Sequence, residues 1–227
     1  MEPTYHLAKG ILKPSLAAWF RWTIEGDERI PRKGAAILAF NHIAFLDPFA
    51  AAYIVARTKR RPRFLAKSEL FQDKRIAWIL RGAGQIEVKR KSREAPMALD
   101  HALDALDRGE IIVVFPEGTI TEDPDLSPME AKTGVARLAL GSGVPVIPCA
   151  LWGTANIWPK GYAKCWWPPK QDILARVGEP LRVVGDPNSA EDWRRVAAEV
   201  MEQIAVLVAS LRPIVPDRRR PARKKAA

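Results

Sequence analysis

The sequence contains very few cysteines. Cys149 and Cys165 are the only two in 227 residues, and neither belongs to a cluster that would suggest metal ligation. Cys149 lies in an apolar run, which predicts a buried thiol and is compatible with a reducing compartment. We therefore expect no metal site.

The chain also lacks the pattern of a signal peptide and that of a spanning helix. Residues 7–24 are interrupted by four basic or proline residues, and no small-residue cleavage site follows them. Residues 35–56 are long enough to cross a bilayer, but polar groups, including Asp47, fall in their middle. An aspartate at the centre of a membrane helix costs about 2.5–3.5 kcal/mol on insertion scales. We therefore expect neither a signal peptide nor a spanning helix.

What the sequence does have is an ordinary globular composition with a basic excess. Hydrophobic residues make up 48% and charged residues 27%, and the formal net charge is +10. Half of this excess lies in residues 217–227, and we expect residues 213–227, rich in proline and arginine, to form a disordered basic tail. Basic proteins often bind nucleic acid, but no nucleic-acid-binding motif is present. We therefore predict no nucleic-acid partner.

Apolar runs of strand length alternate with stretches of helical period, which predicts an α/β fold. The run Ile111-Ile112-Val113-Val114-Phe115 is apolar on both faces, as in a central strand covered by helices on each side. The expected fold is a single domain with a mixed, largely parallel sheet covered by helices on both faces. Strands are expected at residues 35–40, 63–66, 85–89, 111–115, 145–151 and 173–177.

Helices are expected between these strands, at residues 47–57, 68–81, 95–108, 130–140 and 189–211. Asp47 followed by Pro48 is typical of a helix N-cap with proline in the first turn. Ser189 with Asp192 three residues later resembles a capping box. Residues 5–24 mix apolar, aromatic and basic side chains, which indicates an N-terminal amphipathic helix that lies on a membrane or packs on the domain's own core.

His42 and Asp47 are the first candidate catalytic residues. His42 follows an apolar strand and Asp47 begins the next helix, and open α/β sheets bind ligands where strands end and helices start. A tight strand-to-helix turn would bring the two side chains together. Asp47 would then accept a proton from one imidazole nitrogen and leave the other free to act as a base. Taken alone, the pair fits a buried histidine and a helix cap better.

Further segments at strand ends strengthen the functional interpretation. Phe115-Pro116-Glu117-Gly118-Thr119 ends the central strand, residues 84–90 end another strand with two cations, and residues 144–148 enter a third between prolines. Together with Asn41-His42-x4-Asp47, in this order, they resemble the four sequence blocks of the glycerolipid acyltransferase family, which contains bacterial 1-acylglycerol-3-phosphate acyltransferases. The resemblance covers about residues 34–151, roughly half of the chain.

The resemblance implies an enzyme that moves a fatty acyl group from acyl-CoA or acyl-ACP to the hydroxyl of lysophosphatidic acid, in phospholipid biosynthesis. His42 would be the general base and Asp47 would orient it, and the hydroxyl would attack the thioester directly without an acyl-enzyme. No cofactor is implied beyond the acyl thioester co-substrate. A thioesterase that uses the same histidine on water is the enzymatic alternative, although no serine nucleophile elbow is present.

The resemblance also implies a set of substrate-binding residues. An arginine fork can bind two phosphate oxygens at once, while Glu117 could accept a bond from a glycerol hydroxyl or order the cations around it. For the two lysines, an ordinary solvated surface position is the alternative. The set comprises Lys67, Arg90, Glu117, Gly118, Thr119 and Lys132.

One departure from the family pattern leaves the acceptor open. Many relatives have an arginine where this chain has Ile120, and acidic residues 122–125 follow it. Glycerol 3-phosphate or another lysolipid is therefore an alternative acceptor.

The acceptor lipid implies membrane contact. We expect residues 1–30 to be a helical membrane-contact segment, residues 31–212 the acyltransferase domain, and the protein to be peripheral on the cytoplasmic face of the cell membrane. Anionic membrane lipids would be partners, attracted also by the basic tail. Four tryptophans in residues 151–170 either form a rim at the interface or fill the core of a loop.

Overall fold

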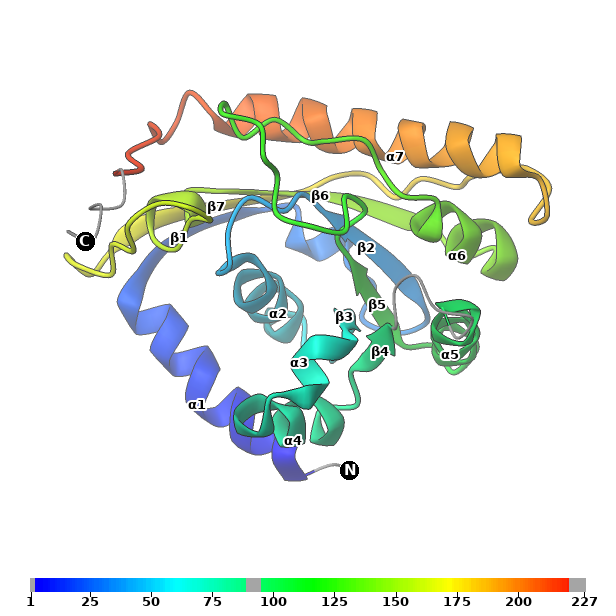
Figure 1. The fold of residues 1–227 in the computed structure, drawn as a ribbon, viewed down its shortest axis with the longest axis horizontal. Helices are drawn as coiled ribbons and strands as arrows, with labels where there is room; N and C mark the ends of the chain where they lie inside the picture. The colour runs from blue at the N-terminus through cyan, green and yellow to red at the C-terminus, as the bar shows by residue number, and fades with distance from the viewer. Residues whose placement is uncertain (1–2, 89–94, 221–227) are drawn as a thin grey trace, which may run out of the picture.

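Within the described residues, 3–88 and 95–220, the chain forms a seven-stranded sheet in the order β1-β7-β6-β2-β5-β3-β4 (Figure 1). The structure is a computed structural model. Neighbouring strands run parallel except β6 and β7, which are antiparallel, so the prediction of a mixed, largely parallel sheet is confirmed. The strands are β1 (Phe20–Glu25), β2 (Ala36–Phe40), β3 (Pro62–Lys67), β4 (Ile86–Val88), β5 (Ile111–Val114), β6 (Val146–Trp152) and β7 (Gln171–Val177).

Helices cover both faces of this sheet. Figure 1 shows α7 along one side and α2 on the other, with α1 reaching from the sheet edge toward α4. Two short 3-10 helices, Asp27–Arg29 and Thr154–Asn156, complete the described elements. The α-helices are α1 (Pro3–Trp19), α2 (Asp47–Arg57), α3 (Ser68–Gln72), α4 (Lys74–Gly82), α5 (Ala95–Asp107), α6 (Gly134–Ser142) and α7 (Ala190–Leu211).

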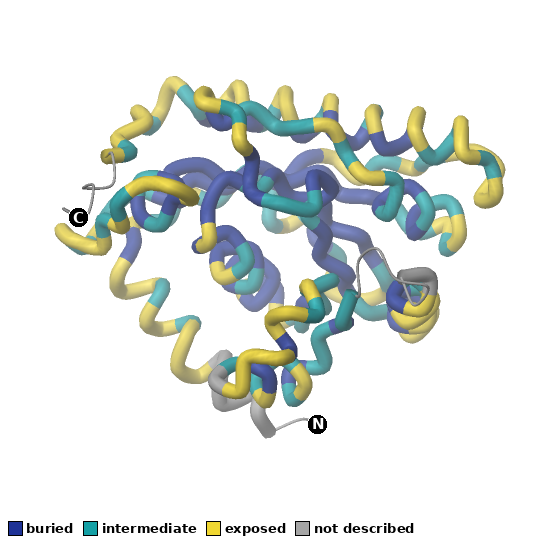
Figure 2. The backbone as a smooth tube through the Cα atoms, in the orientation of Figure 1, coloured by how far each residue is buried: buried dark blue, intermediate teal, exposed yellow. Residues whose placement is uncertain are grey.

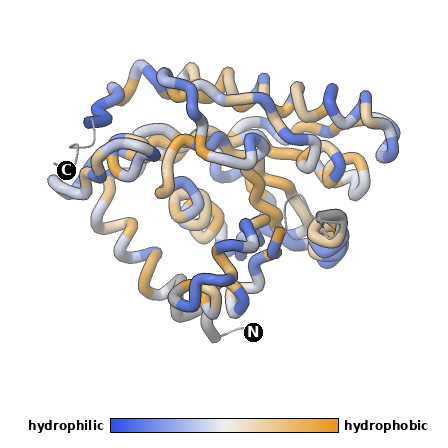
Figure 3. The backbone as a smooth tube through the Cα atoms, in the orientation of Figure 1, coloured by the Kyte–Doolittle hydropathy of each residue, from blue (hydrophilic) through white to orange (hydrophobic). Residues whose placement is uncertain are grey.

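The central strands are buried because both of their faces are apolar. In β2, Ile37 and Ala39 pack with α5, α6 and α7, whereas Leu38 and Phe40 point to the opposite face and pack with α2. Such alternation follows from the two-residue repeat of a strand. The tube is buried through β2, β5 and β6 in Figure 2, and the same strands are hydrophobic in Figure 3. This core holds the carboxyl ends of β2 and β5 in place.

The N-terminal helix predicted for residues 5–24 extends too far toward the C-terminus. Helix α1 ends at Trp19, and the next six residues form β1, which pairs in parallel with β7. Phe20, Trp22 and Ile24 are residue types that favour strands, and Trp22 stacks on Tyr53 with ring centroids 4.3 Å apart. The prediction of a helix over residues 20–24 was therefore wrong, since tertiary pairing decides this segment.

Two other predicted helices differ from those observed. Residues 68–82 form two helices, because Asp73 adopts an extended conformation between α3 and α4. The helix predicted at 130–140 begins only at Gly134 and continues to Ser142, after a long loop that follows β5. The cap of α7 agrees with its prediction in part, because Ser189 Oγ accepts a hydrogen bond from Asp192 N at 3.2 Å.

Residues 213–220, the first part of the tail expected to be disordered, form hydrogen bonds with the rest of the chain. The Trp152 indole N–H donates to Val215 O at 2.7 Å, and Ala163 N donates to Arg220 O at 3.0 Å. These contacts hold the segment along the connection between β6 and β7, because its backbone groups find partners there. Residues 221–227 lie outside the described residues.

None of the helices in the described parts of the chain has the length and apolar character needed to cross a membrane. Residues 35–56, which were considered as a spanning segment, are divided between β2, a turn and α2.

Two neighbouring positions on α7 test the packing. Ile204 is fully buried and Val206 is 60% exposed. Ile204→Ala should lower the free energy of unfolding by about 2–5 kcal/mol, because it leaves a cavity in the core. Val206→Ala, the matched control, should change it by less than about 0.5 kcal/mol. Urea unfolding measures both values, and equal effects would contradict the packing described for α7.

Candidate active site

The turn between β2 and α2 brings His42 and Asp47 together. His42 Nδ1 lies 2.9 Å from Asp47 Oδ2, a hydrogen-bonding distance. The turn lies at the carboxyl end of β2, between β5 and β6 in the sheet. The predicted proximity of the two side chains is therefore what the structure shows.

Asp47 differs from the predicted helix N-cap. Leu46 occupies the N-cap position and Asp47 is the first helical residue. Its carboxylate turns back over the preceding loop, where Oδ2 accepts hydrogen bonds from Ile43 N at 2.6 Å and Ala44 N at 2.7 Å. The side chain therefore organises the turn that carries His42.

The second oxygen of Asp47 has a partner distant in sequence. Thr154 Oγ1 donates to Asp47 Oδ1 at 2.6 Å, and both residues are fully buried. Burial of a charge is costly unless hydrogen bonds replace the lost water. Four donors meet this requirement and fix the direction in which the carboxylate faces the imidazole.

The imidazole of His42 is held on its face as well as at its edge. Its ring stacks on Phe115, with centroids 4.4 Å apart and an interplanar angle of 28°. The side chain is 16% exposed. Because Nδ1 is engaged by Asp47, Nε2 is the nitrogen available to a substrate hydroxyl.

The loop after β5 holds the backbone of His42. Glu117 Oε1 accepts a hydrogen bond from His42 N at 2.8 Å, and His42 O accepts one from Thr121 N at 2.7 Å. Glu117 Oε2 accepts a third bond from Met129 N at 3.0 Å. His42 is therefore positioned through its main chain by a segment 75 residues further along the chain.

These contacts show what the Glu117 carboxylate does within the fold. The residue is only 2% exposed, and both carboxylate oxygens face backbone N–H groups. Burial raises the pKa of the Glu117 carboxyl above its ordinary value, although the backbone hydrogen bonds and the nearby His42 act in the opposite direction. Direct binding of a glycerol hydroxyl, one of the two roles considered for Glu117 from the sequence, stays a prediction. Glu117 positions His42.

Four more of the predicted binding residues, Lys67, Gly118, Thr119 and Lys132, lie at the same sheet edge. Gly118 has a φ of 71°, and a Cβ there would lie 3.1 Å from the Lys132 side chain. Lys132 N also donates to Pro116 O at 2.9 Å, so Lys132 and the half-buried Thr119 belong to the Glu117 turn. Lys67 is exposed at the end of β3, which runs parallel to β5.

The structure describes only one of two further positions singled out in the sequence, Arg90 and Ile120. Arg90 lies outside the described residues, so its predicted contact with a phosphate stays a prediction. Ile120 is buried, with 6% of its surface exposed. An apolar side chain at this position is therefore part of the packing under the loop.

Sequence reasoning missed two partners of the turn that carries His42. Asn41 is fully buried, and its amide both donates to Leu151 O at 3.0 Å and accepts from Leu151 N at 2.7 Å, which ties the end of β2 to β6. Thr154 bonds Asp47 across 107 residues of sequence, and no local pattern marks it. The position of Asn41 directly before His42 was the signal that could have identified the first of these.

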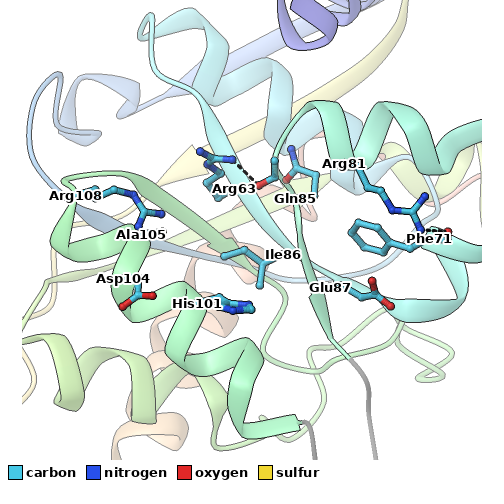
Figure 4. Close-up of a pocket in the computed structure, with 11 residues that line it drawn as sticks. Arg63, Phe71, Arg81, Gln85, Ile86, Glu87, His101, Asp104, Ala105 and Arg108 are labelled. Atoms are coloured by element: carbon cyan, nitrogen blue, oxygen red, sulfur yellow. Dashed lines mark hydrogen bonds between the residues drawn. The ribbon is translucent and has the colours of Figure 1, made fainter. Parts of the chain in front are cut away.

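A cavity of about 460 Å³ lies away from this turn, between β4, α4 and α5 (Figure 4). Arg63 in its wall donates to Gly84 O at 2.6 Å and pairs with Glu110, and Arg81 donates to Phe71 O at 2.9 Å. None of the predicted site residues lines the cavity. Its basic groups are already engaged, so it is not a candidate for the reaction centre.

The fold and the turn together form one arrangement. An α/β sheet carries a histidine at its carboxyl edge, and a buried aspartate lies within hydrogen-bonding distance of the imidazole, a geometry that suits a general base. Within residues 3–88 and 95–220, no group of three or more histidine, cysteine, aspartate or glutamate side chains is placed to hold a metal ion.

Comparison with known proteins identifies the family. Residues 21–152, more than half of the chain, match the family model described as Acyltransferase. The chain therefore belongs to the acyltransferase family, and the family prediction is confirmed.

Individual relatives agree with this assignment. The chain is 28% identical to the chloroplastic 1-acyl-sn-glycerol-3-phosphate acyltransferase BAT2 of Brassica napus, over 69% of this chain and 44% of that protein. It is 30% identical to the 1-acyl-sn-glycerol-3-phosphate acyltransferase of Borreliella burgdorferi, over 69% of this chain and 62% of that protein. The chain thus matches about two fifths to three fifths of the length of these curated relatives.

A solved structure shares the fold. The crystal structure of the 1-acyl-sn-glycerophosphate acyltransferase PlsC from Thermotoga maritima superposes with a TM-score of 0.67 at 27% identity. The match covers 89% of this chain and 79% of the other. It confirms the predicted single α/β domain.

Glu117→Gln tests the burial of this carboxyl. Because the folded-state pKa of Glu117 is raised, the folded protein holds the proton more tightly than the unfolded chain. The unfolding free energy of the wild type minus that of the variant should therefore fall as pH rises from the ordinary glutamate pKa through the raised value, and stay constant above it. Urea unfolding at a series of pH values measures this difference.

Glu122→Gln is the control for this experiment. Glu122 is exposed and its pKa is lowered by Lys160, which lies 2.8 Å away. Its contribution to stability should be lost as pH falls, the opposite direction to that of Glu117. A Glu117 difference that rises with pH would mean that the backbone hydrogen bonds outweigh the effect of burial.

Proposed function

We propose that the protein transfers a fatty acyl group from an acyl thioester to the free hydroxyl of lysophosphatidic acid and so forms phosphatidic acid. The observation that carries the proposal is the 2.9 Å contact between His42 Nδ1 and the buried Asp47 carboxylate, which leaves Nε2 available as a base. The choice of acceptor is supported by the names of the relatives, which are 1-acyl-sn-glycerol-3-phosphate acyltransferases.

The reaction needs one proton carrier and no covalent enzyme intermediate. His42 Nε2 takes the proton of the acceptor hydroxyl while the hydroxyl oxygen attacks the thioester carbonyl carbon. The negative Asp47 carboxylate stabilises the imidazolium that forms. When the tetrahedral intermediate collapses, the carbon–sulfur bond breaks and the thiolate leaves with the proton that His42 carries. The products are the ester and the free thiol.

Direct transfer is supported by the placement of the cysteines. Cys149 is fully buried within β6, and burial raises the pKa of its thiol well above the ordinary value. A buried neutral thiol is a poor nucleophile. Cys165 lies in the connection between β6 and β7 and forms a hydrogen bond to Trp167 O at 3.2 Å. Neither cysteine belongs to the turn that carries His42.

Cations at the carboxyl edge of the sheet support an anionic acceptor. Lys132 lies against Gly118, and Lys67 ends the strand beside β5. Together with Arg90, they would bind the phosphate of lysophosphatidic acid and place its hydroxyl near His42. Glycerol 3-phosphate or another lysolipid is the alternative acceptor, because Ile120 replaces a cation that many relatives have. The donor is acyl-CoA or acyl-ACP.

The enzyme would work as a peripheral protein on the cytoplasmic face of the cell membrane. Large apolar side chains are exposed in the described part of α1, with fractions of 58% for Ile11, 40% for Leu12 and 40% for Trp19. Exposed apolar and tryptophan side chains on a helix favour contact with the headgroup region of a bilayer. The basic C-terminal residues would add attraction to anionic lipids.

Substitution of the catalytic pair tests the role of His42 and Asp47. His42→Ala should lower kcat by about a hundredfold to ten-thousandfold, the usual contribution of a general base. Asp47→Asn should lower kcat at least about tenfold, because the variant loses the charge that stabilises the imidazolium. Steady-state assays of thiol release with lysophosphatidate measure both effects, and circular dichroism checks the fold.

His101 provides a matched control, since this histidine is exposed on α5 and lines the cavity away from the turn. His101→Ala should leave turnover unchanged. Near-normal turnover in a folded His42→Ala variant would refute the assignment of the base.

A panel of acceptors separates the transferase from a thioesterase. Thiol release should depend on lysophosphatidate and should be accompanied by one new ester per thiol. Glycerol 3-phosphate and uncharged lysolipids should support slower release, because they lack either the acyl chain or the phosphate that the cations bind. Release that is indifferent to every acceptor would identify a hydrolase, and faster release with glycerol 3-phosphate would reassign the acceptor.

A further inference from the structure

Residues 157–170, the β6–β7 connection, present tryptophans at the surface. Of the tryptophans in and beside it, Trp152 is buried, with its indole N–H bonded to Val215 O, so it belongs to the core. Trp166 is 39% exposed and Trp167 is 73% exposed, more than any other tryptophan in the described chain. Figure 2 shows most of this connection exposed. Trp167 therefore does not fill the core of the loop.

This surface is continuous with the catalytic turn. The Trp158 ring contacts Phe45, with centroids 5.8 Å apart, and Trp166, with centroids 5.6 Å apart. Phe45 lies between His42 and Asp47 in the turn, is 46% exposed, and its N–H donates to Trp158 O at 3.0 Å. A membrane that contacts the connection would therefore also lie close to His42.

The connection is held in shape by hydrogen bonds at both of its ends. Cys165 N donates to Ile157 O at 2.8 Å, Gln171 Nε2 donates to Cys165 O at 2.6 Å, and the Trp19 indole N–H donates to Trp166 O at 3.1 Å. These bonds fix the tryptophans next to the end of α1. An ordered loop loses little conformational entropy when it binds a surface.

The charge of the connection suits an anionic partner. Residues 157–170 contain three lysines and no acidic residue. Lys160 pairs with Glu122 at 2.8 Å, whereas Lys164 lies over the Trp158 ring at 4.7 Å, and Lys170 is exposed. The basic C-terminal segment adds to this charge, because Ala163 N bonds Arg220 O.

We propose that the β6–β7 connection is a second membrane-contact element, in which Trp167 enters the headgroup region of an anionic bilayer and Lys164 and Lys170 contact lipid phosphates. Tryptophan prefers this region because its ring is apolar and its N–H can remain hydrated. If both the connection and α1 contact the membrane, the turn that carries His42 would face the lipid surface from which the acceptor comes. The inference rests on the proposed function only for the benefit of bringing His42 to the acceptor, since lipid binding itself needs no acyl transfer.

Vesicle binding without substrates tests the inference. Trp167→Ser should bind vesicles of phosphatidylcholine and phosphatidylglycerol about tenfold more weakly than the wild type, which corresponds to about 1.4 kcal/mol. Lys164→Gln with Lys170→Gln should weaken binding to these vesicles but not to vesicles of pure phosphatidylcholine, because only the former carry negative charge. Cosedimentation measures both affinities, and urea unfolding checks that each variant folds.

Val206→Ser is the matched control, because Val206 is 60% exposed on α7, away from the connection. It should bind vesicles like the wild type. Unchanged vesicle binding of both loop variants would overturn the inference. So would unchanged vesicle binding combined with weaker binding of acyl carrier protein, which would make the connection a protein-docking surface. His42→Ala should bind vesicles normally, so vesicle binding tests this inference even if the proposed acyl transfer proves wrong.

Discussion

The buried carboxylate of Asp47 is the interaction on which the site depends. It is fully buried and has four hydrogen-bond donors, two from the turn itself, one from His42 and one from Thr154. Hydrogen bonds to a charged group contribute about 1.5–3 kcal/mol each, and a donor left without its partner costs a comparable amount. The turn therefore cannot change shape without leaving the carboxylate or several of its donors without hydrogen-bond partners. Held in this way, the Asp47 carboxylate gives His42 one orientation, in which Nδ1 faces the carboxylate and Nε2 remains for the proposed reaction.

The fold supplies the supports around this carboxylate from strands on both sides of β2. The loop after β5 holds the backbone of His42 through Glu117 and Thr121, and the end of β6 holds Asn41 and presents Thr154. In the reaction that we propose, a base fixed by three neighbouring strand ends would be pre-organised, because little reorganisation is needed when the proton moves. The same arrangement explains why the motifs lie far apart in the sequence: parallel strands bring their carboxyl ends to one edge.

Much of this could be predicted from the sequence, because apolar runs and capping residues are local signals. The central strands, the final helix and the closeness of His42 to Asp47 follow from such signals. Contacts between distant segments carry no comparable signal, and this is where prediction failed. Phe20–Glu25 pairs with β7 and so becomes a strand, and Thr154 meets Asp47 across 107 residues. Glu117 was recognised as important, but its role as a support for His42 depends on burial that the sequence does not display.

Heteronuclear NMR of the imidazole nitrogens tests the central claim most directly, with His42→Ala providing the assignment. If Asp47 orients His42 as the 2.9 Å contact indicates, the neutral ring carries its proton on Nδ1, hydrogen-bonded to Asp47, and Nε2 is unprotonated. Asp47→Asn should weaken or abolish this preference. A neutral His42 with its proton on Nε2 in the wild type would contradict the account, because that tautomer could not accept a proton from the acceptor hydroxyl at the exposed nitrogen.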